Sequence, residues 1–303
     1  MFGSTLLIVV SWALLAVFVV AFILRTIRIA RLPVHLRWEL APVPHEKGKS
    51  HYGGSYLEEF EWWTKPREKD SIKEASYMLQ EILLLKSVWE NNRRLWWFSF
   101  PFHTGMYVLI GAGALLLLSN GLEVVGVQTA GGWQGGISIL AGAGFALGGI
   151  GALGLLVSRF VDPRFRDYTT PAALFNLILL LAIFVTGGYV VAASQNLAGS
   201  VWDFGTGLVT GDLSVELSGV LQAHVLLALV FLAYLPFTRM MHFVAKYFTY
   251  HQVRWDDEPL VAGGRLEQEA NRLLEQPVTW GAPHVNANGS KNWVDVATEE
   301  MKT

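Results

Sequence analysis

The feature that most constrains this chain is a long apolar stretch, residues 222–251, with the sequence QAHVLLALVFLAYLPFTRMMHFVAKYFTYH. As a helix, this stretch is long enough to cross the roughly 30 Å hydrocarbon core of a bilayer. His224 and His242 lie 18 residues apart within it, which is about five helical turns or roughly 27 Å. The spacing predicts two imidazoles on one face of a single helix, near opposite membrane surfaces. Ionisable side chains in such segments are costly and usually functional.

Composition and four further apolar stretches indicate that the whole chain is a membrane protein. Of its 303 residues, 52% are hydrophobic and only 16% are charged, whereas about 25% of the residues of a soluble domain are charged. Together with residues 222–251, the other stretches predict an all-α membrane protein, a bundle of five transmembrane helices. The other four stretches are residues 6–24, 95–118, 137–157 and 171–191.

The distribution of basic residues predicts how this bundle is oriented. Four arginines lie in residues 25–37 and three in the connection 158–170, SRFVDPRFRDYTT. The connections 119–134 and 194–216 contain no lysine or arginine. Because basic residues concentrate in cytoplasmic loops, we expect the N-terminus outside the cell and the C-terminus in the cytoplasm.

Two polar segments are expected in the cytoplasm. In the extended loop 30–94, the apolar spacing of residues 71–89 predicts an amphipathic helix, on the membrane surface or under a partner. In the tail, we expect one short helix at 265–275 and no core of its own, so that the rest is either disordered or in contact with a soluble subunit. The predicted division is a first transmembrane helix at 1–29, the loop at 30–94, a four-helix membrane region at 95–251 and the tail at 252–303.

Three histidines of the extended loop, His35, His45 and His51, lie near glutamates. No metal-ligand spacing recurs among them. We therefore interpret this part of the loop as a solvated segment or a docking surface, not as a metal site.

The chain contains no cysteine. It therefore cannot hold an iron–sulfur cluster through thiolates, a covalently attached c-type haem or a disulfide. If electrons pass through the chain, histidine must bind the carrier, and any iron–sulfur cluster must lie in a partner. The net charge of −2 gives no indication of nucleic-acid binding.

A third histidine, His103, lies near the predicted cytoplasmic end of residues 95–118. The predicted topology brings His103 and His242 to the same membrane face, where they could hold one low-spin b-type haem between them. Two separate core histidines are the alternative. Arg239, about one turn before His242, could pair with a haem propionate or extend to lipid phosphate. His224 is left near the outer face, either as the only protein ligand of a five-coordinate haem or as a proton donor or acceptor for a quinone.

Small residues in the membrane segments predict close helix packing. Residues 137–157 are dense in glycine, and we expect tight contact with neighbouring helices there. Gly105, Gly111 and Gly113 leave the backbone of residues 95–118 bare, for a flat macrocycle or another helix. Asn176 is expected to form a hydrogen bond between helices.

Three ordered motifs carry a family resemblance: FHTG at 102–105, RFVDPRFRDYTT at 159–170, and H-x17-H ending in PFTRMMH at 236–242. Over about residues 95–255 the chain resembles the cytochrome b gamma subunit of respiratory nitrate reductase. It is most similar to relatives that work with heterodisulfide-reductase-like iron–sulfur proteins. The resemblance implies that two helices supply four histidines to two stacked b haems, with quinol handled near the outer haem. The matching ligands are His103, His224 and His242, and Gly113 stands at the fourth position.

The resemblance also implies a cytoplasmic iron–sulfur partner and a location in the prokaryotic cytoplasmic (inner) membrane. The expected function is that of a haem b membrane subunit, with one or two haems, between the menaquinone or quinone pool and that partner. It would be the quinone-reactive subunit of an oxidoreductase complex. A transporter would require charged or broken helices at mid-membrane, which the apolar stretches lack. A non-redox anchor for a soluble complex is the remaining alternative.

Overall fold

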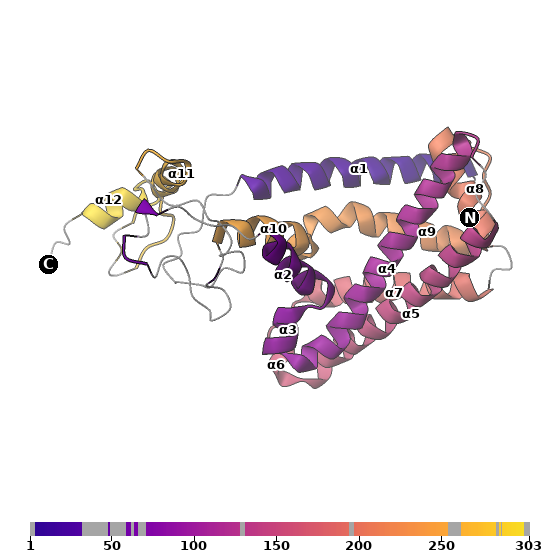
Figure 1. Cartoon of the computed structure of the whole chain (residues 1–303), viewed down its shortest axis with the longest axis horizontal. Coiled ribbons are helices and arrows are strands. Elements are labelled where there is room, and N and C mark those ends of the chain that lie inside the picture. Colours follow the sequence, from indigo (N-terminus) through magenta and orange to yellow (C-terminus); the bar gives the residue numbers. More distant parts are fainter. Residues whose placement is uncertain are drawn as a thin grey trace. The chain divides into compact units, whose positions relative to one another are not determined.

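The structure, a computed structural model, is built from helices (Figure 1). All the regular elements among the residues it describes are helices, which confirms the predicted all-α class. The described residues are 4–31, 48, 59–61, 64–65, 71–127, 131–193, 197–253, 262–282, 285 and 287–299. His35, His45 and His51 lie outside them.

Among the described residues, five helices are long and apolar enough to cross a membrane, as predicted. A helix satisfies its own backbone hydrogen bonds, so it is one of the few structures that lipid tolerates. The candidate spans are Thr5–Ala30, Arg93–Ser119, Gly135–Val161, Pro171–Ala193 and Gly219–Phe237. They belong to α1 (Ser4–Ala30), α4 (Arg93–Val124), α5 (Gly131–Val161), α7 (Pro171–Ala193) and α9 (Gly219–Tyr234).

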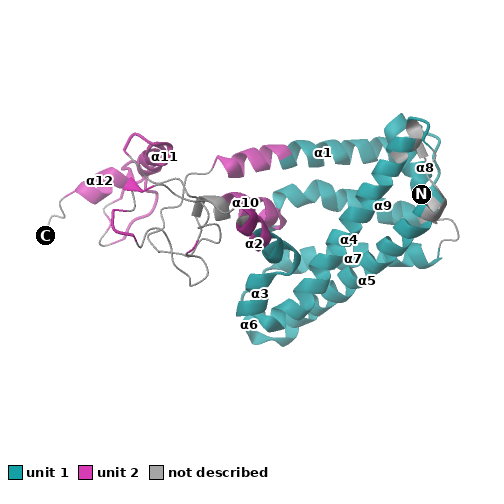
Figure 2. Cartoon of the chain, viewed as in Figure 1, with its two compact units in different colours: residues 1–22, 78–239 teal, residues 23–77, 240–303 magenta. Residues whose placement is uncertain are grey.

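The chain divides into two compact units (Figure 2). The first comprises residues 1–22 and 78–239, and the second comprises residues 23–77 and 240–303. In the first unit, α4 packs against α5, α5 against α7, and α7 against α9. The membrane helices α4, α5, α7 and α9 are therefore joined in chain order.

The contact between α4 and α5, called here the α4–α5 seam, is formed by glycines on both helices. A Cβ atom added to Gly105 would lie 2.3 Å from the backbone nitrogen of Gly148, and one added to Gly151 would lie 2.4 Å from that of Phe102. These distances leave no room for a side chain. The expectation that the glycines of residues 137–157 serve helix packing is confirmed at this seam.

Another helix of the first unit, α8 (Leu197–Thr210), was not expected, because residues 194–216 were interpreted as a connection. Phe204 of α8 is buried with Leu7 and Ile8 of α1, and Leu208 packs beside them. Phe204 and Leu208 are four residues apart and therefore lie on one helical face. Packing of this apolar face against α1 stabilises residues 197–210 as a helix.

The predicted single helix across residues 222–251 is interrupted. After α9, two short 3₁₀ turns, Leu235–Phe237 and Arg239–Met241, precede α10 (His242–Val253). Pro236 explains the break, because proline lacks an N–H and its ring clashes with the carbonyl one turn earlier. Thr238 is extended, with φ −111° and ψ 171°. The prediction that His224 and His242 share one face of an unbroken helix is therefore wrong.

The predicted amphipathic helix at 71–89 is also divided, into α2 (Ser71–Leu83) and α3 (Lys86–Asn91). Leu85 lies between them in the left-handed region, with φ 51°. Side chains of α4 contact the carbonyls at this break: Trp96 Nε1 donates to Leu84 at 2.7 Å, and Tyr107 donates to Ile82 at 3.0 Å. Such contacts satisfy carbonyls that the end of a helix leaves without partners.

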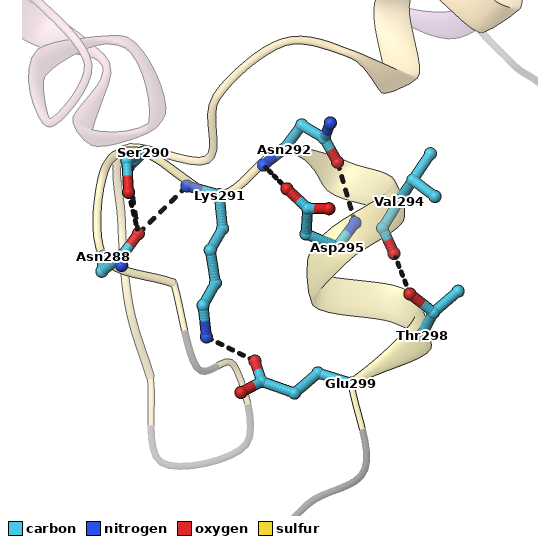
Figure 3. A network of polar contacts seen from close by, with 8 residues as sticks. All are labelled: Asn288, Ser290, Lys291, Asn292, Val294, Asp295, Thr298 and Glu299. Carbon is cyan, nitrogen blue, oxygen red and sulfur yellow. Dashed lines mark hydrogen bonds and ion pairs between the residues drawn. The ribbon is translucent and has the colours of Figure 1, made fainter.

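In the tail, the predicted short helix is α11 (Arg265–Leu274), and a second one is α12 (Trp293–Thr298). Asn292 and Asp295 form a capping box at the start of α12 (Figure 3). Val278 and Ala270 are buried, with exposed fractions of 2% and 8%. The expectation that the tail has no core of its own stays a prediction.

The turn between α5 and α7 contains the four-residue helix α6 (Pro163–Arg166). Asp162 caps it by accepting from the Arg164 backbone N–H at 3.1 Å, and it pairs with the Arg164 guanidinium at 2.8 Å. The hydrogen bond from Arg164 lowers the pKa of the Asp162 carboxyl.

Candidate functional site

The three histidines predicted to serve haem or quinone lie on three different helices. His103 is on α4 and His224 is on α9, and both are half-buried in the first unit. His242 is the first residue of α10 in the second unit, and its side chain is exposed. The pairing of His103 with His242 joins the two units and stays a prediction.

The imidazole of His103 is oriented by its own helix. Its Nδ1 lies 2.7 Å from the carbonyl oxygen of Ser99, one turn earlier. A carbonyl oxygen can only accept, so Nδ1 carries the proton and donates it. The other ring nitrogen, Nε2, therefore has the lone pair. The rings of Phe102 and Tyr107 lie beside the imidazole, at centroid distances of 5.1 and 6.3 Å.

The imidazole of His224 is oriented by a neighbouring helix. Its Nδ1 lies 3.0 Å from Oγ1 of Thr186 on α7. The hydroxyl of Thr186 has one proton, and this oxygen lies 2.7 Å from the carbonyl of Ala182. Because the carbonyl takes that proton, Oγ1 must accept from Nδ1 of His224. Here too, Nε2 has the lone pair.

Two further residues shape the surroundings of His224. The Phe145 ring on α5 lies nearly perpendicular to the imidazole, at a centroid distance of 5.4 Å and an interplanar angle of 83°. A Cβ atom added to Gly187 would lie 2.8 Å from Cε1 of His224. Sequence reasoning missed Thr186, Gly187 and Phe145. Thr186 had a signal, because it is a hydroxyl residue followed by two glycines in a largely apolar helix.

These residues fit a histidine-ligated haem. Histidines that bind a metal through one nitrogen usually donate the other N–H to a carbonyl or another acceptor, as His103 and His224 do. Among the described helices, α4 and α9 are not one of the pairs in broad contact. A Cβ atom added to Gly111 or Gly113 of α4 would meet no heavy atom within 4 Å. Bare backbone of this kind allows a flat ring to approach.

The fourth predicted binding residue, Arg239, lies in the 3₁₀ turn between α9 and α10, where its side chain is exposed. Pro236 lies in the preceding 3₁₀ turn and Thr238 lies between the two turns, and all three residues are part of the PFTRMMH motif. The predicted pairing of Arg239 with a propionate stays a prediction.

Membrane-length helices that present histidines in this way define a class, the membrane cytochromes b. Residues 86–256 match the family described as the nitrate reductase gamma subunit, and the chain belongs to that family. The match spans more than half of the chain and includes His103, His224 and His242. No curated protein matched the chain. The chain is thus a multi-pass membrane protein of a family of haem b electron-transfer subunits, which assemble with other redox subunits of respiratory oxidoreductases.

Proposed function

We propose that this protein passes electrons between the quinone pool and a cytoplasmic iron–sulfur oxidoreductase subunit, as the quinone-reactive subunit of the complex. The observation that carries the proposal is that His103 and His224 have the same tautomer and the same hydrogen-bonding pattern. Each engages its Nδ1 proton in a hydrogen bond and keeps the lone pair on Nε2. Bound haem would supply one-electron oxidation and reduction at its iron.

His103 and His242 are proposed to hold the haem nearer the cytoplasmic partner. In this role, His103 offers Nε2 while the Ser99 carbonyl keeps the ring in one orientation. Arg239 would pair with a propionate, where a planar guanidinium can donate two hydrogen bonds to one carboxylate. The indoles of Trp89 and Trp96 pack near the start of α4, with centroids 4.8 Å apart. Their apolar surface would limit the access of water to that end of the helix.

His224 is proposed to serve the outer side, as ligand of a second haem or as proton donor and acceptor for the quinone. Gly113, at the position of the family's fourth ligand, is exposed and has open space around it. A haem held by His224 would then lack this second protein ligand. If His224 handles quinone instead, its unprotonated Nε2 would accept a proton from quinol.

The proposed orientation has the N-terminus outside and the C-terminus in the cytoplasm of a prokaryote. Its support is the set of exposed arginines at α6, together with the lack of basic residues in the connections 119–134 and 194–216. The loop 30–94 and the tail 252–303 would then dock a heterodisulfide-reductase-like protein carrying iron–sulfur clusters. The tail offers exposed aromatic surface for this purpose at Trp280 and Trp293, whose rings lie 6.1 Å apart.

Haem content of the purified protein tests the proposal first. The measurement is haem per polypeptide by pyridine haemochrome, with a reduced-minus-oxidised spectrum of the same sample. Two haems would assign iron to His224 despite Gly113, and one haem would leave His224 to the quinone. Folded protein that contains no haem after growth with adequate haem supply would contradict the proposal and leave the non-redox anchor.

Paired substitutions test the ligand assignment. His103→Ala and His242→Ala should each abolish the same low-spin haem signal, because an iron that loses one axial imidazole changes coordination and spin state. Tyr247→Phe, at an exposed residue of α10 whose ring packs against Phe248, is the matched control and should keep the signal. Persistence of the signal in either histidine variant would refute the pairing.

A further inference from the structure

The contact between Thr186 and His224 joins two membrane helices through a single polar pair. Thr186 lies on α7 and His224 on α9, and 3.0 Å separates Oγ1 from Nδ1. Both residues lie within candidate membrane spans, where water is scarce and polar groups must find protein partners. The contact with Thr186 therefore influences which nitrogen of the His224 imidazole carries the hydrogen.

The hydroxyl of Thr186 donates its only proton to backbone carbonyls of its own helix. Oγ1 lies 2.7 Å from the carbonyl of Ala182 and 3.2 Å from that of Ile183, and both of these oxygens can only accept. Toward Nδ1 of His224 the hydroxyl can then act only as an acceptor. This arrangement selects the tautomer with hydrogen on Nδ1.

Close approach of the two helices is required for this contact, and Gly187 permits it. This glycine follows Thr186 and is buried, and a Cβ atom there would lie 2.8 Å from Cε1 of His224. On another side, the ring of Phe145 lies nearly perpendicular to the imidazole, at a centroid distance of 5.4 Å. The ring is thus confined between α5 and α7.

We propose that Thr186 is a positioning residue, which fixes the tautomer and orientation of His224 so that Nε2 binds a haem iron. The inference rests on the proposed haem function and deepens it. An acceptor on Nδ1–H makes the imidazole a more basic ligand. A more basic ligand stabilises the oxidised iron and lowers its reduction potential. Loss of the hydroxyl should therefore weaken haem binding and raise that potential.

Three variants isolate the hydroxyl. Thr186→Val removes it and keeps the shape of the side chain, and Thr186→Ser keeps it and removes a methyl group. Thr186→Ala also removes the hydroxyl without adding bulk, so it serves if the valine variant does not fold. The matched control is Tyr234→Phe, which removes another α7–α9 hydrogen bond, from Tyr234 to Asn176 at 3.0 Å, without touching His224.

The readouts are haem content and the midpoint potential of the haem signal that disappears in His224→Ala. In the valine or alanine variant, we expect that haem to bind about 10- to 100-fold more weakly, which is the usual effect of removing the hydrogen-bond partner of a metal ligand. We also expect the midpoint potential of that haem to rise. Thr186→Ser and Tyr234→Phe should keep the wild-type potential, which separates positioning from a general loss of packing.

Each contrary result identifies what has failed. If wild-type protein carries haem and the valine and alanine variants keep its amount and potential, the role of Thr186 is refuted. If His224→Ala loses no haem, His224 does not bind iron; this inference then fails, while the haem function through His103 stands. A wild-type protein without haem overturns both the proposed function and this inference.

Discussion

His103 and His224 reach the same chemical state by different means. The imidazole of His103 donates to a carbonyl of its own helix, so its orientation is set once α4 has formed. The imidazole of His224 donates to a hydroxyl on α7, so its orientation depends on how α7 and α9 pack. The first arrangement is insensitive to side-chain substitution at its acceptor, whereas the second can be removed by changing one residue.

The surroundings of the two histidines also differ: backbone packing dominates near His103, and individual side chains surround His224. Beside His103, Phe102 lies against Gly151 at the α4–α5 seam, where backbones meet without intervening side chains. Beside His224, the contacts are the ring of Phe145 and the small Gly187. We therefore expect the His103 site to be sensitive to changes in the helix interface and the His224 site to changes in single polar groups.

The largest expected effect is at the α4–α5 seam. Gly105→Ala places a Cβ atom 2.3 Å from the nitrogen of Gly148, and because backbone cannot move aside, the helices must separate. Overpacking of this kind costs about 1–3 kcal/mol. We expect lower resistance to unfolding in detergent and loss of the haem signal that depends on His103. Thermal melts with haem spectra of the same samples would measure both.

Gly121→Ala is the matched control for this prediction. It makes the same change on the same helix, but its Cβ atom would meet nothing within 4 Å. Alanine is the better helix former by about 1 kcal/mol, so this variant should be as stable as the wild type or more stable. Equal stability of Gly105→Ala and Gly121→Ala would show that the seam does not support the His103 site.

The next largest effect concerns Gly113, which we proposed to stand at the position of the family's fourth ligand. If His224 binds a haem that lacks a second protein ligand, Gly113→His should supply one and convert that haem to a six-coordinate, low-spin form. The reduced variant should then no longer bind carbon monoxide at that haem. Optical and paramagnetic resonance spectra, with and without carbon monoxide, measure the change.

Ala114→His is the control for Gly113→His, because the next residue points about 100° away around the helix. It should leave the spectrum as in the wild type. If both histidine variants behave alike, position 113 is not where a second ligand would stand, and the comparison with the family at this residue is wrong.

How much of this could be predicted from the sequence depends on the range of the interactions involved. The five membrane helices follow from local hydropathy, and His103 and His224 follow from their place in apolar segments. The break at Pro236 was also encoded locally, but the length and hydropathy of residues 222–251 outweighed it. By contrast, the role of Phe204 in α8 and the contact of Thr186 with His224 depend on which helices become neighbours. Hydropathy carries no such information.

A smaller effect is expected for the second polar pair between α7 and α9. Tyr234 donates to Oδ1 of Asn176 at 3.0 Å, which confirms the helix–helix hydrogen bond expected at Asn176. A double-mutant cycle with Tyr234→Phe and Asn176→Ala should give a coupling of about 0.6 kcal/mol, the average for such bonds in membranes. Haem content and potential should not change. A shift in the potential of the His224-dependent haem would mean that any loss of α7–α9 contact perturbs His224, and Thr186 would have no special part.

The smallest effect is expected at the α5–α6 corner, where the α4–α5 seam ends. The hydrogen bond from Arg164, with a smaller contribution from the charge of Arg94, lowers the pKa of Asp162 in the folded protein. The charged carboxylate therefore adds stability at a pH above its unfolded pKa, and this contribution disappears as the pH falls through the folded pKa. Asp162→Asn keeps the capping oxygen and removes the charge. It should lower the melting temperature slightly at about pH 7, and this difference should disappear at a pH below the lowered folded pKa, where residue 162 is neutral in both proteins.

Asp167→Asn is the control for Asp162→Asn, because Asp167 pairs only loosely with Arg166, at 3.8 Å. Exposed ion pairs contribute little, so the difference between the two variants should be close to the resolution of the melts. The haem signal that depends on His103 should be unaffected in both, because the corner lies beyond the contact of Phe98 with Gly154. If Asp162→Asn alone altered that signal, electrostatics at the corner, and not only helix packing, would control the His103 site. The two sites would then no longer differ in that His103 responds to helix packing and His224 to a single polar group.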